Sequence, residues 1–444
     1  MANGVRRTYF LAALYILAVH YAYVEYINPV FEYLRYDYLQ FSLSELLITY
    51  FLSWIVIVFY KNTAHPAQAI VGLLYILVYI PAQLIILFTV DKTYYEIVLP
   101  QIALAASMAF LFVAARTYKE PSRSRVVFRR FFTLDATMVI FMVLAICLVV
   151  FNDFDHMRFV TFEQVYDLRA ESVSANKSKL AEYSQAFLAY FFTTYFYARG
   201  LVYKKWIYIG VGLIGSMAIY MAEAAKAIIL LLPITYALIV IWKDGRGFLW
   251  RVILSALLGV VVLVLVVPDE GVYRWVKSII LLRVIGSDGW VLAKYMEYFD
   301  KNGFTYYSHI GPIQAIFGGY LYGDYSLGQL IGMVYNGSPE YNHNASFWAS
   351  DGFAAFGVLG IFIITPFVGV FFNLFNRLTY IFPTSFVIAW AAGFIIAFLN
   401  TPFTTALFSF GGLGILFVGW WATKKVKNIE KCGKISSNSL VIQQ

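Results

Sequence analysis

Long apolar segments recur along the whole chain, and they limit what it can fold into more than any other feature. A bilayer core about 30 Å thick needs roughly 20 apolar residues per helix, and the 444-residue sequence contains twelve segments of that kind. Charged residues make up only 13% of the chain, about half of the share in soluble domains. We therefore predict an all-α polytopic membrane protein with about twelve transmembrane helices. The segments cover residues 8–28, 41–60, 67–89, 96–115, 133–151, 181–198, 206–221, 225–242, 248–267, 349–373, 381–398 and 404–422.

The unequal distribution of basic residues predicts the orientation of these helices. Cytoplasmic loops carry an excess of Lys and Arg. With the N-terminus placed inside, 21 of the 33 Lys and Arg residues fall on the inner side, together with only four acidic residues. Both termini are therefore predicted to be cytoplasmic. Because the net charge of +8 is spread over loops that flank the membrane, it does not indicate a nucleic-acid partner.

Two outer connections are much longer than the others and divide the chain into regions. Residues 268–345 contain helix-like apolar stretches and Gly-rich turns, which predict a folded outer subdomain rather than a linker. Long loops of this kind commonly carry function. The predicted regions are 1–151 with helices one to five, 152–180 as an outer loop, 181–267 with helices six to nine, 268–345 as the large outer subdomain, 346–423 with helices ten to twelve, and 424–444 as a basic cytoplasmic tail.

The sequence lacks the common motifs of nucleotide and metal enzymes. It contains no P-loop, no G-x-G-x-x-G after a strand, no H-E-x-x-H and no G-x-S-x-G. The five histidines are dispersed, and Cys147 and Cys432 do not form a C-x-x-C pair. We predict that the protein uses neither a metal nor a cofactor.

Cationic residues at the outer boundary are candidates for binding an anionic substrate. Arg169 offers a guanidinium fork that matches phosphate oxygens, but Asp167 and Glu171 are equally suitable partners for it. Lys226 opens an apolar helix, where its charge adds to the free amide N–H groups of the helix N-terminus. Glu223 precedes it by three residues, so a simple ion pair between the two is the alternative.

Three further cations lie in the large outer region. Arg274 and Lys277 share one face of a predicted helix, which fits either a substrate phosphate or the lipid headgroups around an interfacial amphipathic helix. Arg283 lies nine residues beyond Arg274 and points to the opposite side. Since a Gly-Ser-Asp-Gly turn at residues 286–289 follows it closely, we expect Arg283 to be the stronger ligand contact.

The densest polar group precedes the tenth apolar segment. It includes Glu340, Tyr341 and His343. His343 is either a proton acceptor near neutral pH or a residue that hydrogen bonds within the loop. Asp351 lies at the start of the apolar segment, where an ionised group is costly unless it faces water or a partner. Tyr341 and its neighbouring tyrosines fit stacking on sugars as well as a membrane-interface belt.

Two segments resemble the oligosaccharide repeat-unit polymerases of bacterial surface-polysaccharide assembly, the Wzy-type or O-antigen polymerase family. Residues 222–230, Ala-Glu-Ala-Ala-Lys-Ala-Ile-Ile-Leu, are similar to that family's small-residue-then-basic helix opening. Residues 344–360 contain Asp351 and end in Phe-Gly-Val-Leu-Gly, which is similar to its acidic, aromatic F-G-x-x-G helix. The helix number, the inner termini and the enlarged outer loops also fit. In some members an Arg is followed eleven residues later by Gly in both loops, whereas here Arg169 follows Arg158 and Lys294 follows Arg283 at that spacing.

The resemblance implies a GT-C-like glycosyltransferase of the bacterial inner membrane. Its substrates are undecaprenyl-pyrophosphate-linked glycans, and a chain-length regulator and a flippase are implied partners besides the membrane lipids. Arg169, Lys226 and Arg283 would bind the pyrophosphate, and His343, Asp351 or Glu340 would take the proton of the acceptor hydroxyl. Glu223, Arg274, Lys277 and Tyr341 are further expected substrate contacts. No cofactor or metal is implied.

Two other functions are compatible with the sequence. An O-antigen ligase uses the same donor, but such enzymes usually show one dominant outer loop. A lipid-linked oligosaccharide flippase also has about twelve helices, yet its loops are short and its charges line the bundle interior. The polymerase is therefore the expected function.

Overall fold

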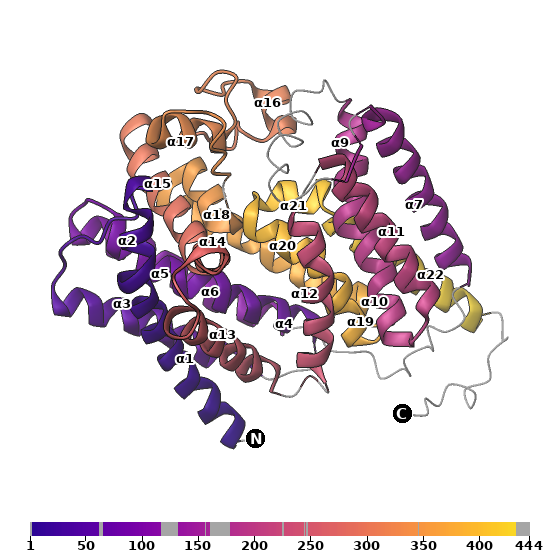
Figure 1. Ribbon diagram of the computed structural model, residues 1–444, viewed down its shortest axis with the longest axis horizontal. Helices are drawn as coiled ribbons and strands as arrows, with labels where there is room; N and C mark the ends of the chain where they lie inside the picture. Colours follow the sequence, from indigo (N-terminus) through magenta and orange to yellow (C-terminus); the bar gives the residue numbers. More distant parts are fainter. Residues whose placement is uncertain are drawn as a thin grey trace. The chain divides into compact units, whose positions relative to one another are not determined.

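The protein is helical throughout its described part. The computed structural model describes residues 2–61, 65–116, 132–155, 157–159, 178–223, 226–243, 245, 247–344 and 346–431, and Figure 1 shows the course of the chain. Helices account for 82% of the structure, and the described residues contain no strand. The chain divides into two compact units. Unit 1 comprises residues 1–117, 245–373 and 398–404, and unit 2 comprises residues 118–244, 374–397 and 405–444.

The helices of unit 1 include three short π-helical turns that interrupt longer helices. Its elements are α1 (Ala2–Ala22), η1 (Tyr23–Ile27), α2 (Asn28–Phe31), η2 (Glu32–Leu34), α3 (Leu43–Ile55), η3 (Val56–Phe59), α4 (Pro66–Leu74), η4 (Tyr75–Tyr79), α5 (Ile80–Thr89), α6 (Tyr94–Ala114), α13 (Phe248–Leu265), α14 (Gly271–Leu281), η7 (Leu282–Gly286), α15 (Ser287–Asn302), α16 (Gly311–Phe317), α17 (Leu327–Asn336) and most of α18 (Phe347–Thr379).

Unit 2 contains the remaining helices. They are α7 (Phe132–Asp153), α9 (Lys179–Phe187), η6 (Leu188–Phe192), α10 (Thr193–Tyr203), α11 (Trp206–Glu223), α12 (Lys226–Trp242), α19 (Thr384–Trp390), α20 (Ala392–Asn400), α21 (Phe403–Ser409) and α22 (Gly412–Lys431), with a few residues of the last α18 turns and of α20 and α21 shared between the units.

Several of these helices are long and apolar enough to cross a membrane. Among the described residues there are seven, or eight if the bent pair α21 and α22 forms one span. They are Gly4–Leu34, Pro66–Thr89, Tyr94–Ala114, Leu134–Asp153, Trp206–Glu223, Phe248–Leu265 and Phe347–Thr379. A multi-pass, all-helical membrane protein is therefore confirmed, while the twelve spans, their orientation and a GT-C-like fold stay predictions.

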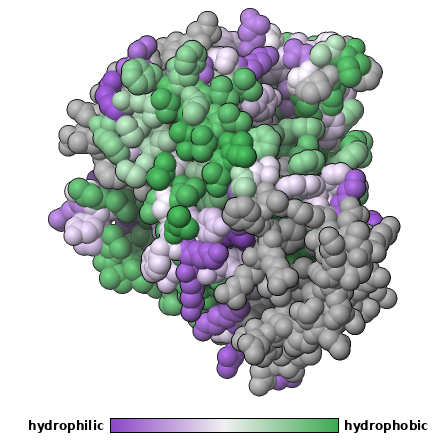
Figure 2. All heavy atoms as spheres, turned by 90° about the vertical axis from the view of Figure 1, so that its right-hand side faces the viewer, coloured by the Kyte–Doolittle hydropathy of each residue, from purple (hydrophilic) through white to green (hydrophobic). Residues whose placement is uncertain are grey.

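Each of the twelve predicted segments lies on helices, but not every helix is long. Leu43–Phe59, Leu230–Trp242 and Thr384–Asn400 are shorter apolar helices. Hydropathy windows count apolar residues and cannot detect where a helix ends or bends, so the number of apolar segments exceeds the number of long helices. In a space-filling view, hydrophobic side chains cover much of one face of the protein (Figure 2). Exposed apolar residues of this kind include Ile140, Phe141 and Leu144 of α7.

The core of unit 1 is the continuous helical segment α4–η4–α5. Every residue of its span Pro66–Thr89 except Leu77 is buried. Two buried amides tie it to α6, because Gln83 Nε2 donates to the carbonyl of Gln101 at 2.8 Å and Gln101 Nε2 donates to the carbonyl of Gln83 at 2.8 Å. Gln68 Nε2 donates to the carbonyl of Phe112 at 2.7 Å. In an apolar surrounding such amides hold neighbouring helices in one register.

A buried ion pair organises one end of unit 2. The Arg199 guanidinium of α10 pairs with the Asp135 carboxylate of α7. Tyr195 and Tyr208 donate their hydroxyls to the same carboxylate at 2.8 Å and 3.0 Å. A buried charge is tolerated only when it is paired and hydrogen bonded, so these groups depend on one another.

We predict that removing one member of this pair destabilises the protein strongly. Arg199→Ala leaves the Asp135 carboxylate buried without its cation, which costs about 3–5 kcal/mol in comparable pairs. The measurement is the thermal unfolding temperature of the purified protein in detergent. Lys179→Ala, at an exposed position of α9, is the control and should change the unfolding temperature little. Equal unfolding temperatures for the two variants would contradict the prediction.

Candidate functional site

Three π-helical turns of unit 1 meet where residues 268–345, predicted above to be the large outer region, join the apolar core. The turn η7 contacts both η1 and η4, although the three are far apart in the sequence. Single π-turns inside helices are rare and occur frequently at functional sites. Because η7 carries Arg283, the convergence places this cation beside the central helix of the unit.

Two glycines allow the helix after η7 to lie directly on α5. A Cβ atom at Gly289 would stand 2.9 Å from the Cα of Ala82 and 2.9 Å from the Cβ of Ile85. At Gly286 it would stand 3.0 Å from Cε1 of Tyr36. Ala82 and Ile85 precede the end of α5 by one to two turns, so the start of α15 lies roughly 6–10 Å below that end along the helix axis. Part of the large outer region therefore runs alongside an apolar span.

A stack of three rings connects α15 with two loops. The Trp290 ring stacks on Tyr36, with centroids 5.5 Å apart and planes inclined by 19°. The His343 ring lies on Trp290 with a centroid distance of 4.7 Å. The indole Nε1 donates to the carbonyl of Arg35 at 3.0 Å. His343 is thus packed against a buried aromatic residue and joins the same site as η7.

Hydrogen bonds fix the His343 loop. The ring nitrogen Nε2 lies 2.8 Å from Oδ1 of Asn336, and the backbone N–H of His343 donates to the carbonyl of Gly328 at 3.1 Å. Tyr295 donates its hydroxyl to the carbonyl of His343 at 3.0 Å. With Nε2–H donating to Asn336, the second ring nitrogen Nδ1 is left as an acceptor.

At this site the neighbouring titratable groups do not neutralise the positive charge of Arg283. Burial raises the pKa of Asp288 to about 8, against smaller lowering contributions from the Arg283 charge and a hydrogen bond with Ser346. Burial lowers the pKa of His343 to about 4, and the Arg283 charge acts in the same direction. Near pH 7 the imidazole is therefore neutral and Asp288 is mostly protonated. Arg283 is exposed, and the described part of the chain places no carboxylate within ion-pair distance of it.

A second polar centre lies at a break in α18. The backbone leaves the helical conformation at Phe356, and Gly357 has φ of +60°. Past the break the helix crosses its own beginning, because a Cβ atom at Gly360 would stand 1.7 Å from the carbonyl oxygen of Gly352. The F-G-x-x-G sequence thus forms the break and the close crossing. Residues 346–355 before it are all buried.

Asp351 has a partner in this centre. His309 Nε2 lies 2.7 Å from Oδ1 of Asp351, and His309 Nδ1 lies 2.7 Å from the Thr305 hydroxyl. The Asp351 side chain is completely buried and that of His309 is 6% exposed. The expected partner that makes an acidic group tolerable in an apolar helix is thus a histidine from the large outer region.

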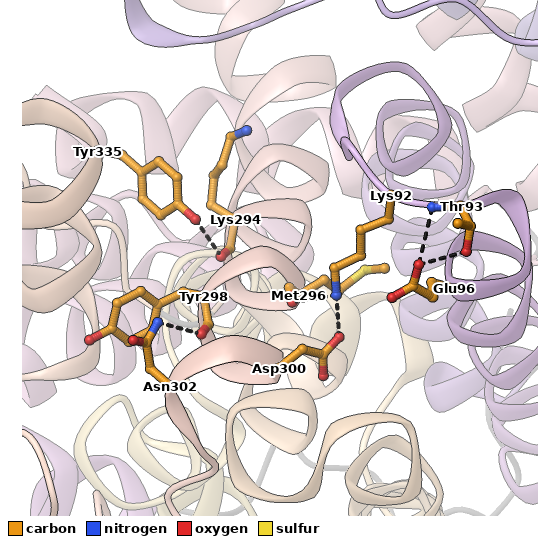
Figure 3. A network of polar contacts seen from close by, with 9 residues as sticks. All are labelled: Lys92, Thr93, Glu96, Lys294, Met296, Tyr298, Asp300, Asn302 and Tyr335. Atoms are coloured by element: carbon orange, nitrogen blue, oxygen red, sulfur yellow. Dashed lines mark hydrogen bonds and ion pairs between the residues drawn. The ribbon is translucent and has the colours of Figure 1, made fainter.

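Polar contacts hold the far end of α15 (Figure 3). Lys92 forms an ion pair with Asp300 and donates to the carbonyl of Met296 at 3.1 Å. Lys294 forms an ion pair with Glu297 at 3.0 Å. Tyr335 of α17 donates to the carbonyl of Lys294 at 3.4 Å. The contacts of Lys92 and Tyr335 attach the second half of α15 to the loop before α6 and to α17.

The structure brings some of the expected residues together and not others. His343 and Arg283 meet at the ring stack, and Asp351 lies at the second centre. Glu340 and Tyr341 are exposed, and the Glu340 backbone N–H donates to the hydroxyl of Ser338 at 3.2 Å.

The remaining expected residues lie elsewhere. Arg274 is exposed on α14, whereas Lys277 is buried with its Nζ 4.3 Å from the centroid of the Tyr26 ring and 4.0 Å from Oδ1 of Asp269. Lys277 therefore has a structural environment of its own. Glu223 is the half-buried last residue of α11 in unit 2. Lys226 opens α12, but its side chain, like the whole of Arg169, falls outside the described residues.

Sequence reasoning did not single out Asp288, His309, Tyr36 and Trp290. Asp288 carries a weak signal, since an acidic residue beside two glycines interrupts an otherwise apolar stretch at residues 284–293. No local pattern marks His309 or Tyr36, because their partners lie 42 and more residues away.

Comparisons of the chain with protein-family models, with curated proteins and with solved structures found no match. The description of the site therefore rests on the residues of this chain.

The shifts at Asp288 and His343 predict how stability depends on pH. The folded-state pKa of Asp288, about 8, lies above its ordinary value of 3.8, so stability falls as the pH rises from about 4 to 8. The folded-state pKa of His343, about 4, lies below its ordinary value of 6.5, so its contribution is lost as the pH falls from about 6.5 to 4. Below pH 6.5 the effects of Asp288 and His343 on the free energy of unfolding have opposite signs. Above pH 6.5 only the loss from Asp288 remains, and it is at most about 1.4 kcal/mol per pH unit.

Asp288→Asn should remove the loss of stability between about pH 6.5 and 8. Thermal unfolding in detergent, measured across pH 4–9, tests this. Asp324→Asn, at an exposed position, should leave the wild-type profile unchanged. A loss as steep as in the wild type after Asp288→Asn would mean that Asp288 is ionised in the folded protein.

Proposed function

We propose that the protein is a glycosyltransferase that polymerises undecaprenyl-pyrophosphate-linked oligosaccharide repeat units at the outer face of a bacterial inner membrane. The observation that best supports this function is Arg283, an exposed cation beside a neutral imidazole and a buried, mostly protonated carboxyl group. An isolated cation next to an apolar span suits a lipid that carries a phosphate headgroup. The proposal includes twelve spans, cytoplasmic termini and a GT-C-like arrangement.

The proposed chemistry requires a cation where the leaving group departs. When the anomeric carbon of the donor separates from the pyrophosphate oxygen, negative charge develops on the phosphate, and a guanidinium held in a partly dehydrated site stabilises it. Arg283 has this role, and Arg169 and Lys226 remain further proposed pyrophosphate contacts. The product is a longer glycan on one lipid carrier.

The helix before η7 offers exposed apolar side chains that suit the tail of such a lipid. On α14, Val272, Tyr273 and Trp275 are exposed next to Arg274. Apolar side chains beside a cation provide both parts of an amphipathic ligand site: aliphatic contact for the prenyl chain and charge for the headgroup. Arg274, on the same helix, is a further proposed headgroup contact.

The function is tested by deleting the gene and displaying the surface glycan and the lipid-linked intermediates on gels. We expect deletion to abolish the glycan ladder while single repeat units still reach the surface, and the wild-type gene to restore the ladder. Polymer that stays on the lipid carrier would instead identify a ligase. Repeat units that stall on the cytoplasmic leaflet would identify a flippase.

Arg283→Ala should reduce elongation by about 10–100-fold, because charge-assisted hydrogen bonds to phosphate are worth about 1.5–3 kcal/mol. Arg283→Lys keeps the charge but loses the planar fork, so an intermediate ladder is expected. Lys301→Ala removes an exposed cation of the same helix–loop region and is the matched control. A full-length ladder from Arg283→Ala at wild-type protein levels would rule out this role of Arg283.

A further inference from the structure

The polar centre at the break of α18 contains oxygen atoms that the protein does not satisfy. Asp351 Oδ2 and Ser350 Oγ have no hydrogen-bond partner among the described residues. Both residues are completely buried. Buried polar atoms are normally paired, and exceptions require an explanation such as a bound water or ligand group. The two residues are adjacent in the sequence.

Hydrogen bonding at His309 orients the Asp351 carboxylate. The Thr305 hydroxyl lies 3.1 Å from the carbonyl of Ala354 and donates to it, so it accepts from Nδ1–H of His309. In the ion-pair form, Nε2–H of His309 then donates to Oδ1 of Asp351. This leaves Oδ2 with a free lone pair. His309 therefore fixes the orientation of the Asp351 side chain.

The segment that carries His309 covers this centre. The backbone N–H groups of Thr305 and Tyr306 donate to the carbonyls of Ala354 and Ala355 at 2.8 Å and 3.0 Å. These carbonyls precede the break in α18, so the segment satisfies groups that a continuous helix would pair internally. The Phe304 ring packs over Gly357, where a Cβ atom would stand 2.8 Å from its Cζ.

The covering segment is strained. Tyr306 and Tyr307 have φ of +53° and +60°, a left-handed conformation that bulky residues rarely adopt. Backbone strain of this kind persists only where the surrounding contacts impose it, and it is concentrated at functional sites and switches. Gly303, with φ of +97°, precedes the segment and Gly311 follows it. Residues 304–310 therefore form a strap between two glycines.

We propose that residues 304–310 are a lid over the acceptor site, in which Asp351 and Ser350 bind the sugar hydroxyl that attacks the donor. This inference rests on the proposed function. The acceptor oxygen forms a bond to the anomeric carbon, the bond from that carbon to the pyrophosphate oxygen breaks, and the pyrophosphate leaves with the electron pair. The hydroxyl proton passes to Oδ2 of Asp351. His309 is a positioning residue.

Neighbouring residues connect this acceptor site with the donor site. The hydroxyl of Tyr295 donates to the carbonyl of His343. Burial raises the pKa of Tyr295, and the charge of Asp351 contributes as the second cause. Tyr295 therefore lies close to Asp351. The same causes raise the pKa of Tyr307. Among the described residues, the titratable groups next to Asp351 are therefore His309, which is hydrogen bonded to it, and the phenols of Tyr295 and Tyr307.

The variant Ser350→Ala tests whether the Ser350 hydroxyl binds a ligand or stabilises the fold. The Ser350 hydroxyl has no protein partner among the described residues, so its removal should leave the unfolding temperature unchanged. If it binds the acceptor, the same change should reduce elongation at least tenfold. The assay mixes detergent-solubilised enzyme with membranes of the deletion strain, which supply the lipid-linked repeat unit. Undiminished elongation by Ser350→Ala would overturn the acceptor site, because it would mean that only water occupies it.

Asp351→Asn should abolish elongation, and His309→Gln should lower kcat more than it raises KM, because the Asp351 side chain loses the hydrogen bond that orients it. Asp324→Asn is the control. If the wild-type gene restores the ladder and Arg283→Ala abolishes it while Asp351→Asn does not, the acceptor site is wrong and the proposed function stands. If the wild-type gene restores no ladder, the proposed function itself fails.

The lid is tested without activity by the labelling of a cysteine with a water-soluble maleimide. Ser308 is 5% exposed, so Ser308→Cys, in a protein with Cys147 and Cys432 replaced by Ala, should react slowly. Adding His309→Gln removes the contact to Asp351 and should accelerate labelling at least fivefold. Asp324→Cys, at an exposed position, should react rapidly in both backgrounds. An unchanged rate at position 308 would rule out the lid.

Discussion

The close approach of α15 to α5 at Gly289 determines where the polar residues of unit 1 lie. Any side chain at this position would meet Ala82 and Ile85, so only glycine lets the two helices touch along their length. The residues on either side, Asp288 and Trp290, are consequently buried. Burial raises the pKa of Asp288. From its buried position, the Trp290 ring contacts the rings of Tyr36 and His343. The position of the proposed donor site therefore depends on the absence of a side chain at Gly289.

Helical class and membrane character could be predicted from the sequence, because apolar residues at this density have no other stable arrangement in a bilayer. The span count could not be tested by the same reasoning. The turn η6 lies within an apolar segment without a Gly or Pro to mark it, whereas Pro81 follows η4 by two residues. The break of α18 lies within a segment that reads as one helix. Likewise, α15 contains Lys294 and Asp300, which indicate a solvated loop, yet tertiary contacts pack it against an apolar span.

The candidate site shows the same division between local and long-range information. Arg283, His343 and Asp351 could be selected from the sequence because a charged or titratable residue next to an apolar segment is costly without a role or a partner. Their grouping could not be selected, since the Arg283 charge acts on His343 across 60 positions of the sequence and Asp351 is hydrogen bonded to His309 across 42. Lys277 carried the same sequence signal as Arg283, and its burial over Tyr26 shows that the signal does not distinguish a ligand contact from a structural cation.

The two polar centres have different surroundings. This difference suits one to the departure of the leaving group and the other to the loss of the acceptor proton in the proposed displacement reaction. Around Arg283 the neighbouring titratable groups are neutral near pH 7, so a negative charge that develops there meets an uncompensated cation. Around Asp351 the His309 ring makes a hydrogen bond to Oδ1, which orients the buried carboxyl group toward the proposed acceptor. Tyr295 on α15 contacts the His343 loop and lies near Asp351. The helix that Gly289 positions against α5 thus sets the separation between the proposed leaving-group cation and the proposed base.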